Sequence, residues 1–371
     1  MRIGIDAHHL NGKPQGTRTY LLGLIKELAR LAPDDRLLIY SFDPAQTRDL
    51  VDAPNIVHRR VFPETARLRL PIVVPLLELV DRVDTFHSQY ICPPVSRVPE
   101  VVSIHDILFE THPDLFRGAF SRRSTWLIRR SAHRARYVVT VSEYSRRALL
   151  EHYNLPEEKV VVTPDAVDPD LFHSLDPDQA PELEEVKTRY QLDAPFVLSI
   201  GRLEPRKNLE RLIRAFDRVR RRLDSNLQLV IAGKEDFRYE SIHREAERLP
   251  SGAVRFFGTV PDEDLPILYN LASALAYPSL VEGFGMPVLE AMACGTPVVS
   301  SPRGALPEVG ADAVIWVEPE DEDSISAGIE DVLTDSEGTA RRRVAGLERA
   351  KGFRWRETAR RTLEVYRDST D

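Results

Sequence analysis

The stretch Glu282-Gly-Phe-Gly-Met-Pro-Val-Leu-Glu290 is the most informative part of the sequence, because it predicts a glycine-rich turn that opens a helix. Pro287 suits an early helical position, since its ring fixes φ and the N–H that it lacks would have no helical partner there. We therefore expect a helix from about Pro287, with Glu290 in its first turn. Gly295 is placed to end this helix, because glycine readily adopts a left-handed conformation.

The segments on either side of this turn have the character of strands. Leu275–Ser279 precedes the turn and Thr296–Ser300 follows the helix, which gives strand, turn, helix and strand in succession. The backbone N–H groups of such a turn and the positive end of the helix dipole point into one space, which suits a phosphate. Two carboxylates beside a phosphate site indicate a ligand that also carries hydroxyl groups, although an acid near a helix start can also simply complement the dipole.

The chain as a whole alternates strand-like and helix-like segments. In the first half, the expected elements are a strand Arg2–Asp6, a helix Tyr20–Leu31 and strands Arg36–Phe42, Val101–Ile104, Tyr137–Val141 and Val160–Thr163. In the second half, they are a strand Pro195–Gly201, a helix Leu209–Leu223 and a strand Leu227–Ala232, followed by the turn described above. This alternation is typical of doubly wound parallel sheets, in which ligands bind at the carboxyl ends of the strands.

The segment 164–172, rich in proline and aspartate, predicts a linker between these two series. We expect an α/β protein of two Rossmann-like domains, residues 1–172 and 173–352, with the active site in the cleft between them. The tail 353–371 predicts a final helix.

Composition restricts the class of protein. The chain has 371 residues, is 42% hydrophobic and carries a net charge of −8, which argues against a general nucleic-acid binder. Cys92 and Cys294, the only cysteines, indicate neither a disulfide framework nor a zinc site, so a reducing cytoplasm fits. Met1–Asp6 enters a strand pattern without a signal peptide, and the apolar run Leu70–Leu77 is too short to span a membrane.

One region departs from the overall negative charge. Between Arg117 and Arg147 the chain has nine arginines and a single acid, Glu143. Such a run is typical of a solvated helix face, and it could also make a weak peripheral contact with an anionic membrane surface.

A second motif follows the first strand of the second series. Gly201-Arg-Leu-Glu-Pro-Arg-Lys-Asn208 places Arg202 and Lys207 at the carboxyl end of that strand, where both cations could reach one diphosphate. Fixed positive groups stabilise a departing diphosphate more than the bound substrate, and they can replace a metal ion. Adjacent cations near a helix start are also common on surfaces, and we expect Arg206 to be such a surface residue.

Two positions in the first half are further candidates. His105 follows a predicted strand and could bond a sugar hydroxyl, while Asp106 could orient the His105 ring, accept a proton or cap the next helix. Gly16, in the segment Asn11–Tyr20 between the first strand and helix, would let the backbone approach a phosphate or acceptor closely.

These motifs together resemble the retaining GT-B glycosyltransferases of family 4, the glycosyltransferase group 1 proteins, whose E-x7-E signature matches 282–290. The resemblance implies that Glu290 binds the nucleotide ribose, Glu282 faces the transferred sugar, and Arg202 and Lys207 stabilise the leaving group. It implies that His105 contacts the donor sugar. The other donor-binding residues that it implies are Gly16, Gly201, Val260, Gly283, Phe284, Gly285 and Met286, with the base received near 256–260.

The function implied by the resemblance is transfer of a hexosyl group from a nucleotide diphosphate sugar, with GDP-mannose favoured, to a saccharide or glycolipid hydroxyl. No metal is expected in the site, retention would follow from front-side attack, and the terminal helix would cross back onto the first domain. An epimerase or phosphorylase of the same fold and a catalytically inactive sugar-nucleotide-binding protein are the alternatives. An NAD-dependent oxidoreductase is disfavoured, because no G-x-G-x-x-G follows the strand at Ile3.

Overall fold

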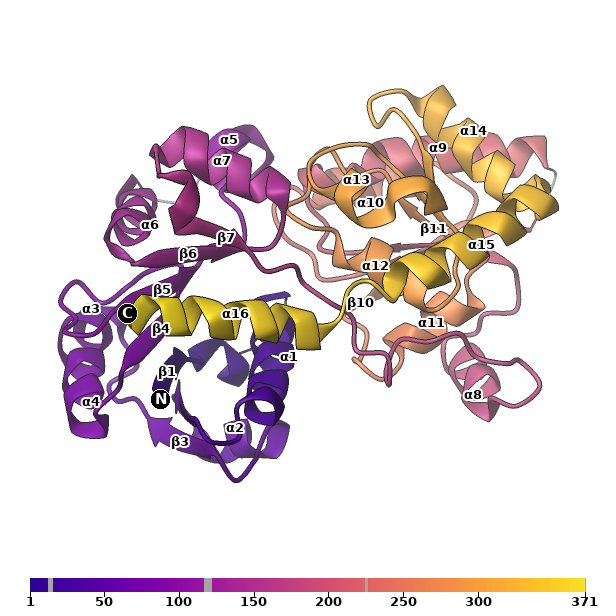
Figure 1. Cartoon of the computed structure of the whole chain (residues 1–371). Coiled ribbons are helices and arrows are strands. Elements are labelled where there is room, and N and C mark those ends of the chain that lie inside the picture. Colours follow the sequence, from indigo (N-terminus) through magenta and orange to yellow (C-terminus); the bar gives the residue numbers. More distant parts are fainter. Residues whose placement is uncertain (13–15, 117–121, 224–225, 371) are drawn as a thin grey trace. The chain divides into compact units, whose positions relative to one another are not determined.

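The chain folds into two compact units, each built around one parallel sheet (Figure 1). This structure is a computed structural model that describes residues 1–12, 16–116, 122–223 and 226–370. Unit 1 consists of Met1–Thr111, Ala119–Ala166 and Arg354–Asp371, and unit 2 of His112–Gly118 and Val167–Phe353. The predicted α/β class with two parallel sheets is confirmed.

Unit 1 contains a seven-stranded parallel sheet in the order β3-β2-β1-β4-β5-β6-β7. Its strands are β1 (Arg2–Asp6), β2 (Arg36–Ser41), β3 (Ile56–Arg60), β4 (Thr85–Gln89), β5 (Glu100–Ser103), β6 (Tyr137–Thr140) and β7 (Val160–Val162). The strands predicted in this half are confirmed to within a residue or so at each end, whereas β3 and β4 were not predicted. The strand order reverses at β1, so the carboxyl ends of β1 and β4 mark the switch point where doubly wound sheets bind ligands.

One face of this sheet is covered by α1 (Gly16–Leu31) and by the terminal helix α16 (Trp355–Thr370), which pack against each other. The close packing depends on Gly23, because a Cβ added there would lie 2.3 Å from the Trp355 ring. On β4, Thr85 bonds Ser369 at 3.0 Å and His87 bonds the Tyr366 hydroxyl at 2.5 Å. The predicted final helix is thus part of unit 1.

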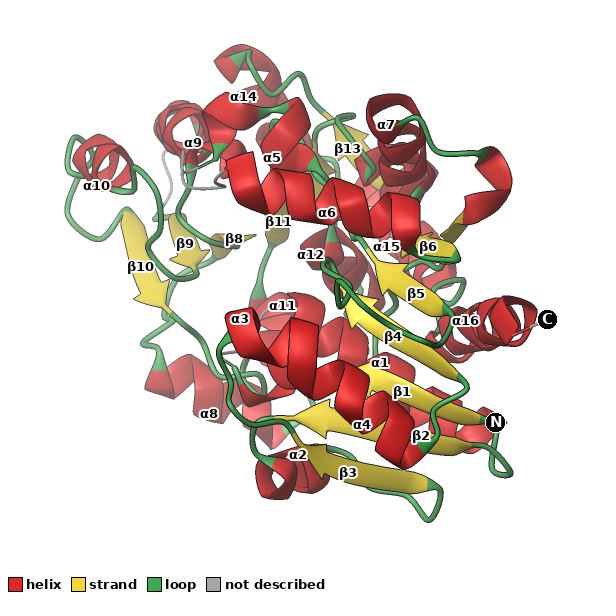
Figure 2. Cartoon of the chain, turned by 90° about the vertical axis from the view of Figure 1, so that its left-hand side faces the viewer, coloured by secondary structure: helices red, strands yellow, loops and turns green. Residues whose placement is uncertain are grey.

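The opposite face of the unit 1 sheet carries α4 (Val74–Asp81), α6 (Arg122–Arg134) and α7 (Glu143–Tyr153), and α4 and α6 lie in front of the strands in Figure 2. Because side chains alternate along a strand, Phe86 of β4 points away from α16 and packs with Val74 of α4. The remaining short elements are η1 (His8–Asn11), α2 (Pro44–Leu50), α3 (Ala66–Leu68), the π-helical turn η2 (Arg69–Val73), α5 (Leu108–Thr111) and η4 (Glu157–Lys159).

Unit 2 contains a six-stranded parallel sheet in the order β10-β9-β8-β11-β12-β13. The strands are β8 (Phe196–Ile200), β9 (Gln228–Ala232), β10 (Val254–Gly258), β11 (Ala274–Tyr277), β12 (Val298–Ser300) and β13 (Val314–Trp316). The helices are η3 (Pro113–Leu115), α8 (Pro181–Arg189), η5 (Pro205–Lys207), α9 (Leu209–Arg222), α10 (Glu240–Ala246), α11 (Leu265–Leu271), α12 (Met286–Ala293), α13 (Leu306–Gly310), η6 (Ala311–Ala313), α14 (Glu322–Thr334) and α15 (Ser336–Ala350). Again, the predicted strands and the helix α9 are confirmed.

The glycine-rich turn after Glu282 forms as predicted, except for the residue at which its helix begins. Gly285, at φ +111°, is the N-cap of α12, so the helix begins at Met286, one residue earlier than expected. Glu290 therefore lies beyond the first turn of α12, and the prediction that it sits in that turn is wrong. Gly295, at φ +72°, follows the end of the helix as expected. None of the helices in the described part of the chain is both long and apolar enough to cross a membrane.

Candidate active site

Glu282 lies in the loop after β11 and is the centre of a buried charged cluster in unit 2. Glu282 is 6% exposed. The ammonium of Lys207 donates to Glu282 Oε1 at 2.7 Å, and the Tyr277 hydroxyl donates to the same oxygen at 2.9 Å. The guanidinium of Arg206 donates to the other carboxylate oxygen. Both oxygens of this buried carboxylate are therefore satisfied by charged or polar donors.

The charges in this cluster stabilise one another. Burial alone would raise the pKa of Glu282, but Arg206 and Lys207 outweigh it and lower the pKa to about 2. Burial, followed by repulsion from Arg206, lowers the pKa of the Lys207 ammonium, and the Glu282 charge opposes this shift. The Glu282 carboxylate is thus fixed in its ionised form at neutral pH, ready to accept hydrogen bonds from ligand hydroxyls.

Arg206 contradicts the expectation of a surface cation. Its side chain is only 14% exposed, and its guanidinium bonds Glu204 Oε1 as well as Glu282. The cause is the short helix η5, after which Asn208 adopts a left-handed φ of +59° and bonds the carbonyls of Pro278 and Pro319. This turn directs two consecutive cations, Arg206 and Lys207, toward Glu282, which spacing along the sequence did not reveal.

Arg202, predicted beside Lys207, has a different environment. Its side chain is 53% exposed and its guanidinium forms an ion pair of 3.1 Å with Asp236. Of the two predicted cations, only Lys207 is shown at the Glu282 carboxylate. Gly201 is required between the strand and this loop, because its φ is +143° and an added Cβ would lie 2.9 Å from Lys207 Cε.

Glu290, the second carboxylate of the motif, has an environment opposite to that of Glu282. It is 9% exposed, and one of its oxygens accepts a 2.7 Å hydrogen bond from the Tyr269 hydroxyl. Burial raises the pKa of Glu290 to about 7, and the bond from Tyr269 reduces the shift only in part. The motif thus contains one carboxylate fixed as an anion and another that titrates near neutral pH.

The remaining donor residues that were predicted in the second half of the chain lie along the same carboxyl edge of the unit 2 sheet. The segment Gly283–Met286 links Glu282 to α12, and Phe284 packs edge to face on Phe353. Gly304, at φ +63°, allows the backbone to pass Glu282 closely, since an added Cβ would lie 2.3 Å from the Glu282 carbonyl oxygen. Val260 is half-buried in the loop after β10.

In unit 1, His105 follows β5 at the carboxyl edge of the sheet. Its ring lies edge to face on Tyr20 at 4.7 Å and stacks on Tyr90 at 5.9 Å. Within the described part of the chain, its Nε2 atom is buried without a hydrogen-bond partner. Burial, with a smaller effect of His9, lowers the pKa of His105 to about 4, so the ring is neutral at pH 7. Asp106 Oδ1 accepts a bond from Leu108 N at 3.1 Å, which agrees with a capping role.

Gly16 was predicted in the loop between the first strand and the first helix. The structure instead makes it the first residue of α1. An added Cβ at Gly16 would contact nothing within 4 Å, so these surroundings do not require glycine. The neighbouring positions of the predicted segment, Lys13, Pro14 and Gln15, lie outside the described residues, as does Arg117 of the arginine-rich region.

An ionic group at the end of β1 was not predicted. Asp6 is 3% exposed and accepts two 3.0 Å bonds from Arg69 Nη1 and one of 2.7 Å from His8 Nδ1. Although burial opposes it, His8 and Arg69 lower the pKa of Asp6 well below its usual value. A buried aspartate at a strand end was the available signal, but its partner Arg69 lies in the π-helical turn η2, which no sequence pattern indicated.

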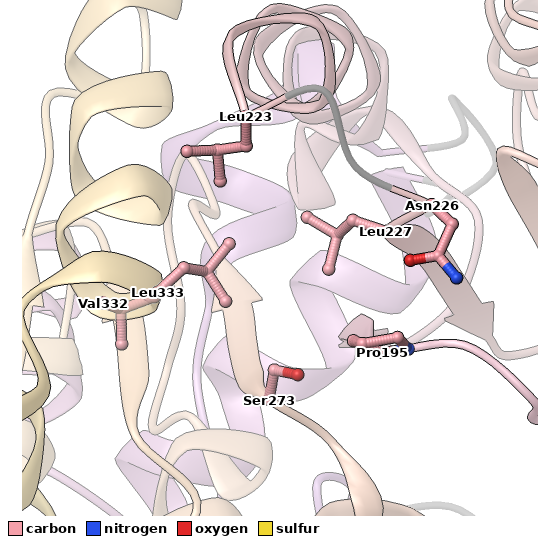
Figure 3. Close-up of a pocket in the computed structure, with 7 residues that line it drawn as sticks. All are labelled: Pro195, Leu223, Asn226, Leu227, Ser273, Val332 and Leu333. Atoms are coloured by element: carbon pink, nitrogen blue, oxygen red, sulfur yellow. The ribbon is translucent and has the colours of Figure 1, made fainter.

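Each unit contains a cavity. In unit 2, a cavity of about 330 Å³ is lined by residues that include Pro195, Leu227 and Ser273 (Figure 3). These residues precede β8, β9 and β11, so this cavity is at the amino edge of the sheet, away from Glu282. In unit 1, a cavity of about 530 Å³ lies near the ends of β2 and β3, and Asn11 and Arg60 are among its lining residues. Among the described residues, no group of three or more His, Cys, Asp or Glu side chains could hold a metal ion.

Comparisons with known proteins find similar sequences over both halves of the chain. Residues 182–349 match the family model for Glycosyl transferases group 1, and residues 14–171 match Glycosyltransferase Family 4. The chain is 34% identical over 268 residues to O-antigen chain mannosyltransferase B of Escherichia coli, covering 72% of this chain and 70% of that protein. It is 33% identical over 250 residues to the GDP-mannose-dependent alpha-(1-6)-phosphatidylinositol monomannoside mannosyltransferase of Mycolicibacterium smegmatis, covering 64% of each chain.

Solved structures show the same fold. The structure of Anabaena Alr3699/HepE in complex with UDP-glucose superimposes with a TM-score of 0.76 over 99% of both chains, at 21% identity. The predicted architecture of two Rossmann-like units is therefore confirmed as a fold.

Proposed function

The chain belongs to the group 1 glycosyl transferases of family 4, and from this premise we propose that it transfers a mannosyl group from GDP-mannose to a saccharide or glycolipid hydroxyl. The observation that carries the proposal is the buried cluster of Glu282 with Lys207 and Arg206 at the carboxyl edge of the unit 2 sheet. The choice of mannose and GDP rests on the names of the two relatives above.

Unit 2 would hold the donor. The Glu282 carboxylate accepts hydrogen bonds from hydroxyls of the transferred sugar, and the Glu290 carboxylate accepts them from the ribose diol. The backbone N–H groups at the start of α12 and the positive end of its dipole bind the diphosphate. Lys207, assisted by Arg202, stabilises the charge that develops on the diphosphate when its bond to the sugar breaks. The position of Arg206 at Glu282 adds a third cation.

Unit 1 would present the acceptor. Among the residues that the structure describes, His105 Nε2 has no hydrogen-bond partner, and it would bond a hydroxyl of the donor sugar. The cavity lined by Asn11 and Arg60 would receive part of the acceptor. Each of these groups is polar and suited to hydroxyl-rich ligands.

The reaction would proceed with retention of the anomeric configuration. The acceptor oxygen attacks the anomeric carbon on the face from which the diphosphate leaves, and the departing phosphate oxygen takes the acceptor proton. One carbon–oxygen bond forms while another breaks, and no protein nucleophile or metal ion takes part. We place this activity in the cytoplasm, in polysaccharide biosynthesis, with weak peripheral contact between the arginine-rich region and the membrane.

The test uses binding and product analysis. Thermal unfolding is recorded with GDP-mannose, UDP-glucose and ADP-glucose, and GDP-mannose is expected to raise the melting temperature most, because a ligand that binds only the folded state stabilises it. Incubation with candidate acceptors should release GDP and yield a product whose anomeric configuration, read by NMR, matches the donor. Conversion of the sugar nucleotide into its epimer, or an inverted product, would contradict the proposal.

A further inference from the structure

A network of buried hydrogen bonds connects the terminal helix α16 with the tyrosine beside His105. The Tyr366 hydroxyl of α16 bonds His87 Nδ1 at 2.5 Å, and His87 Nε2 bonds Ser103 Oγ at 2.7 Å. Ser103 Oγ also bonds the hydroxyl of Tyr20 at 3.1 Å. These four side chains, which we term the α16–α1 network, come from α16, β4, β5 and α1, and α16 lies along β4 and β5 in Figure 1.

The members of the network are buried almost completely. Tyr366 and His87 are 0% exposed, Tyr20 is 1% exposed and Ser103 is 2% exposed. Burial lowers the pKa of His87 to about 3, so its imidazole is neutral at pH 7 and carries one donor and one acceptor nitrogen. Since each ring nitrogen faces a hydroxyl, both nitrogens are satisfied, and the directions of the hydroxyls determine the tautomer.

The two ends of the network favour one direction for its hydrogen bonds. If Tyr366 donates to His87 Nδ1, the neutral ring carries its proton on Nε2 and donates to Ser103. The Ser103 hydroxyl then donates to Tyr20. The remaining Tyr20 O–H interacts electrostatically with Asp165, a buried carboxyl whose Oδ1 has no hydrogen-bond partner within the described part of the chain. In the reverse direction the Tyr366 O–H would have no acceptor among the described residues, so we expect the Nε2–H tautomer of His87.

The His105 ring is held mainly by its contacts with other rings. A histidine in a functional site is usually oriented by a hydrogen bond to one of its nitrogens, but His105 Nε2 has no such partner in the ranges that the structure describes. The ring instead lies edge to face on Tyr20 at 4.7 Å and stacks on Tyr90 at 5.9 Å. The orientation of His105 therefore depends on the plane of the Tyr20 ring, which its hydroxyl fixes through Ser103.

We propose that Tyr366, His87 and Ser103 are positioning residues for the site in unit 1. They fix the Tyr20 ring, and the Tyr20 ring fixes the His105 imidazole in the orientation in which it meets the transferred sugar. A shift of about 1 Å in a site residue can cost about a hundredfold in rate, so a hydroxyl remote from the ligand can affect transfer. The effect on transfer rests on the proposed contact of His105 with the sugar, whereas the effect on the imidazole does not.

The first experiment observes the imidazoles by 15N NMR of the full chain, with signals assigned from His87→Gln and His105→Gln. Tyr366→Phe should populate the second tautomer of His87, because no donor then holds the lone pair of Nδ1. It should also shift the ring signals of His105, although Tyr366 does not contact that residue. The matched control is Tyr40→Phe, which removes an equally buried hydroxyl of unit 1, bonded to Asp81 at 3.0 Å, and should leave the signals of both histidines unchanged.

The second experiment measures the release of GDP from GDP-mannose in the presence of acceptor. Tyr366→Phe and Ser103→Ala should each lower kcat by about tenfold and change the KM for the donor by less than about twofold, because orientation matters most in the transition state. The double variant should be as slow as the slower single variant, since both changes interrupt one network. Tyr40→Phe should keep the parental kcat.

The outcomes separate orientation of the ring from ordinary packing. Signals of His105 that keep their parental positions in both Tyr366→Phe and Ser103→Ala would overturn the proposal, as would an equal shift in Tyr40→Phe. So would a double variant whose loss of kcat is the product of the two single losses, because that would show two independent defects. If GDP-mannose is not a donor, the proposed function fails, and the NMR comparison still decides whether the network orients His105.

Discussion

The Lys207 ammonium lies 2.7 Å from Glu282 Oε1, and the side chains of both residues are less than 10% exposed. A buried ion pair of this kind contributes little net stability, because the cost of desolvating two charges offsets much of their attraction. Removing one partner is costly, since the charge that stays buried loses a compensating group. The pair is therefore better explained by what it does to a ligand than by what it does for the fold, and this distinction can be measured.

We predict that Lys207→Met and Glu282→Gln each lower kcat/KM for transfer by about a hundredfold or more, as loss of a single charge-stabilising group does. Each change should also destabilise the protein, by about 3 kcal/mol in urea unfolding, because its partner stays buried and charged. The double variant should recover much of the stability but none of the activity. Transfer by the double variant at the parental rate would show that the pair has a structural role only.

Arg202 gives a contrasting prediction. Because its side chain is half-exposed and its pair with Asp236 is at the surface, Arg202→Gln should change the unfolding free energy by less than about 1 kcal/mol. If Arg202 stabilises the leaving diphosphate, kcat should nevertheless fall by about tenfold to a hundredfold. The control is Asp236→Asn, which keeps the cation and removes its surface partner. Equal kcat values for the parent and Arg202→Gln would limit the leaving-group role to Lys207 and Arg206.

Much of the fold follows from local patterns, and the reason is physical. Buried parallel strands are continuous apolar runs, and glycine or proline marks their ends, so β1, β8 and the unit around Glu282 could be located from sequence. The strand β4, with the sequence Thr-Phe-His-Ser-Gln, could not, because Thr85 and His87 in it are polar and find their partners, Ser369 and Tyr366, on α16. Those partners are distant in the chain.

The candidate site shows the same limit. The motifs identified Glu282, Glu290 and Lys207, because their chemistry depends on short spacing within one turn or strand end. The inward position of Arg206 depends on the left-handed Asn208, and the partner of Asp6 depends on the π-helical turn that contains Arg69. Neither the direction of a side chain in an irregular loop nor a partner sixty residues away can be predicted from spacing.

If Glu290 binds the ribose, as we propose, donor binding should depend on pH. Its pKa is raised to about 7 by burial, and only the ionised carboxylate accepts hydrogen bonds from both hydroxyls of a ribose. The affinity for GDP should therefore increase as the pH rises through about 7, and Glu290→Gln should remove this dependence while weakening binding at pH 8. Isothermal titration between pH 6 and 8.5 measures both effects. A parental affinity that is independent of pH would contradict the ribose assignment, and Glu337→Gln, at an acid of unit 2 whose side chain is 84% exposed, is the control.

Treatment with a chelator tests the prediction that no metal ion takes part in transfer. Since Lys207, Arg206 and Arg202 provide positive charge for the departing diphosphate, transfer should continue after treatment with EDTA and gel filtration. The measurement is the initial rate of GDP release before treatment, after it, and after addition of Mg²⁺ or Mn²⁺. An activity that disappears with EDTA and returns with one of these ions would show that the cations of the chain are not sufficient.

Part of the pH dependence of stability should arise in unit 1, where Glu78 and Glu100 lie near Arg134. Burial raises the pKa of each carboxyl to about 7, against about 4.5 in the unfolded chain. Between these values each of these two carboxyls binds more protons in the folded state than in the unfolded state, so their contribution to the unfolding free energy decreases as the pH rises from about 5 to about 7.5. Each unit of pKa difference corresponds to about 1.4 kcal/mol.

Glu282 has the opposite sign, because its pKa is lowered to about 2, and its contribution is lost only as the pH falls below about 4.5. The variant Glu78→Gln/Glu100→Gln should therefore flatten the decrease between pH 5 and 7.5 and leave the acid limb below pH 4.5 intact. Urea unfolding across this range gives both slopes. A double variant that loses stability with pH as steeply as the parent would mean that these two carboxyls are already ionised in the folded protein at pH 5. Their partner would then be Arg134, whose guanidinium lies 3.9 Å from Glu100.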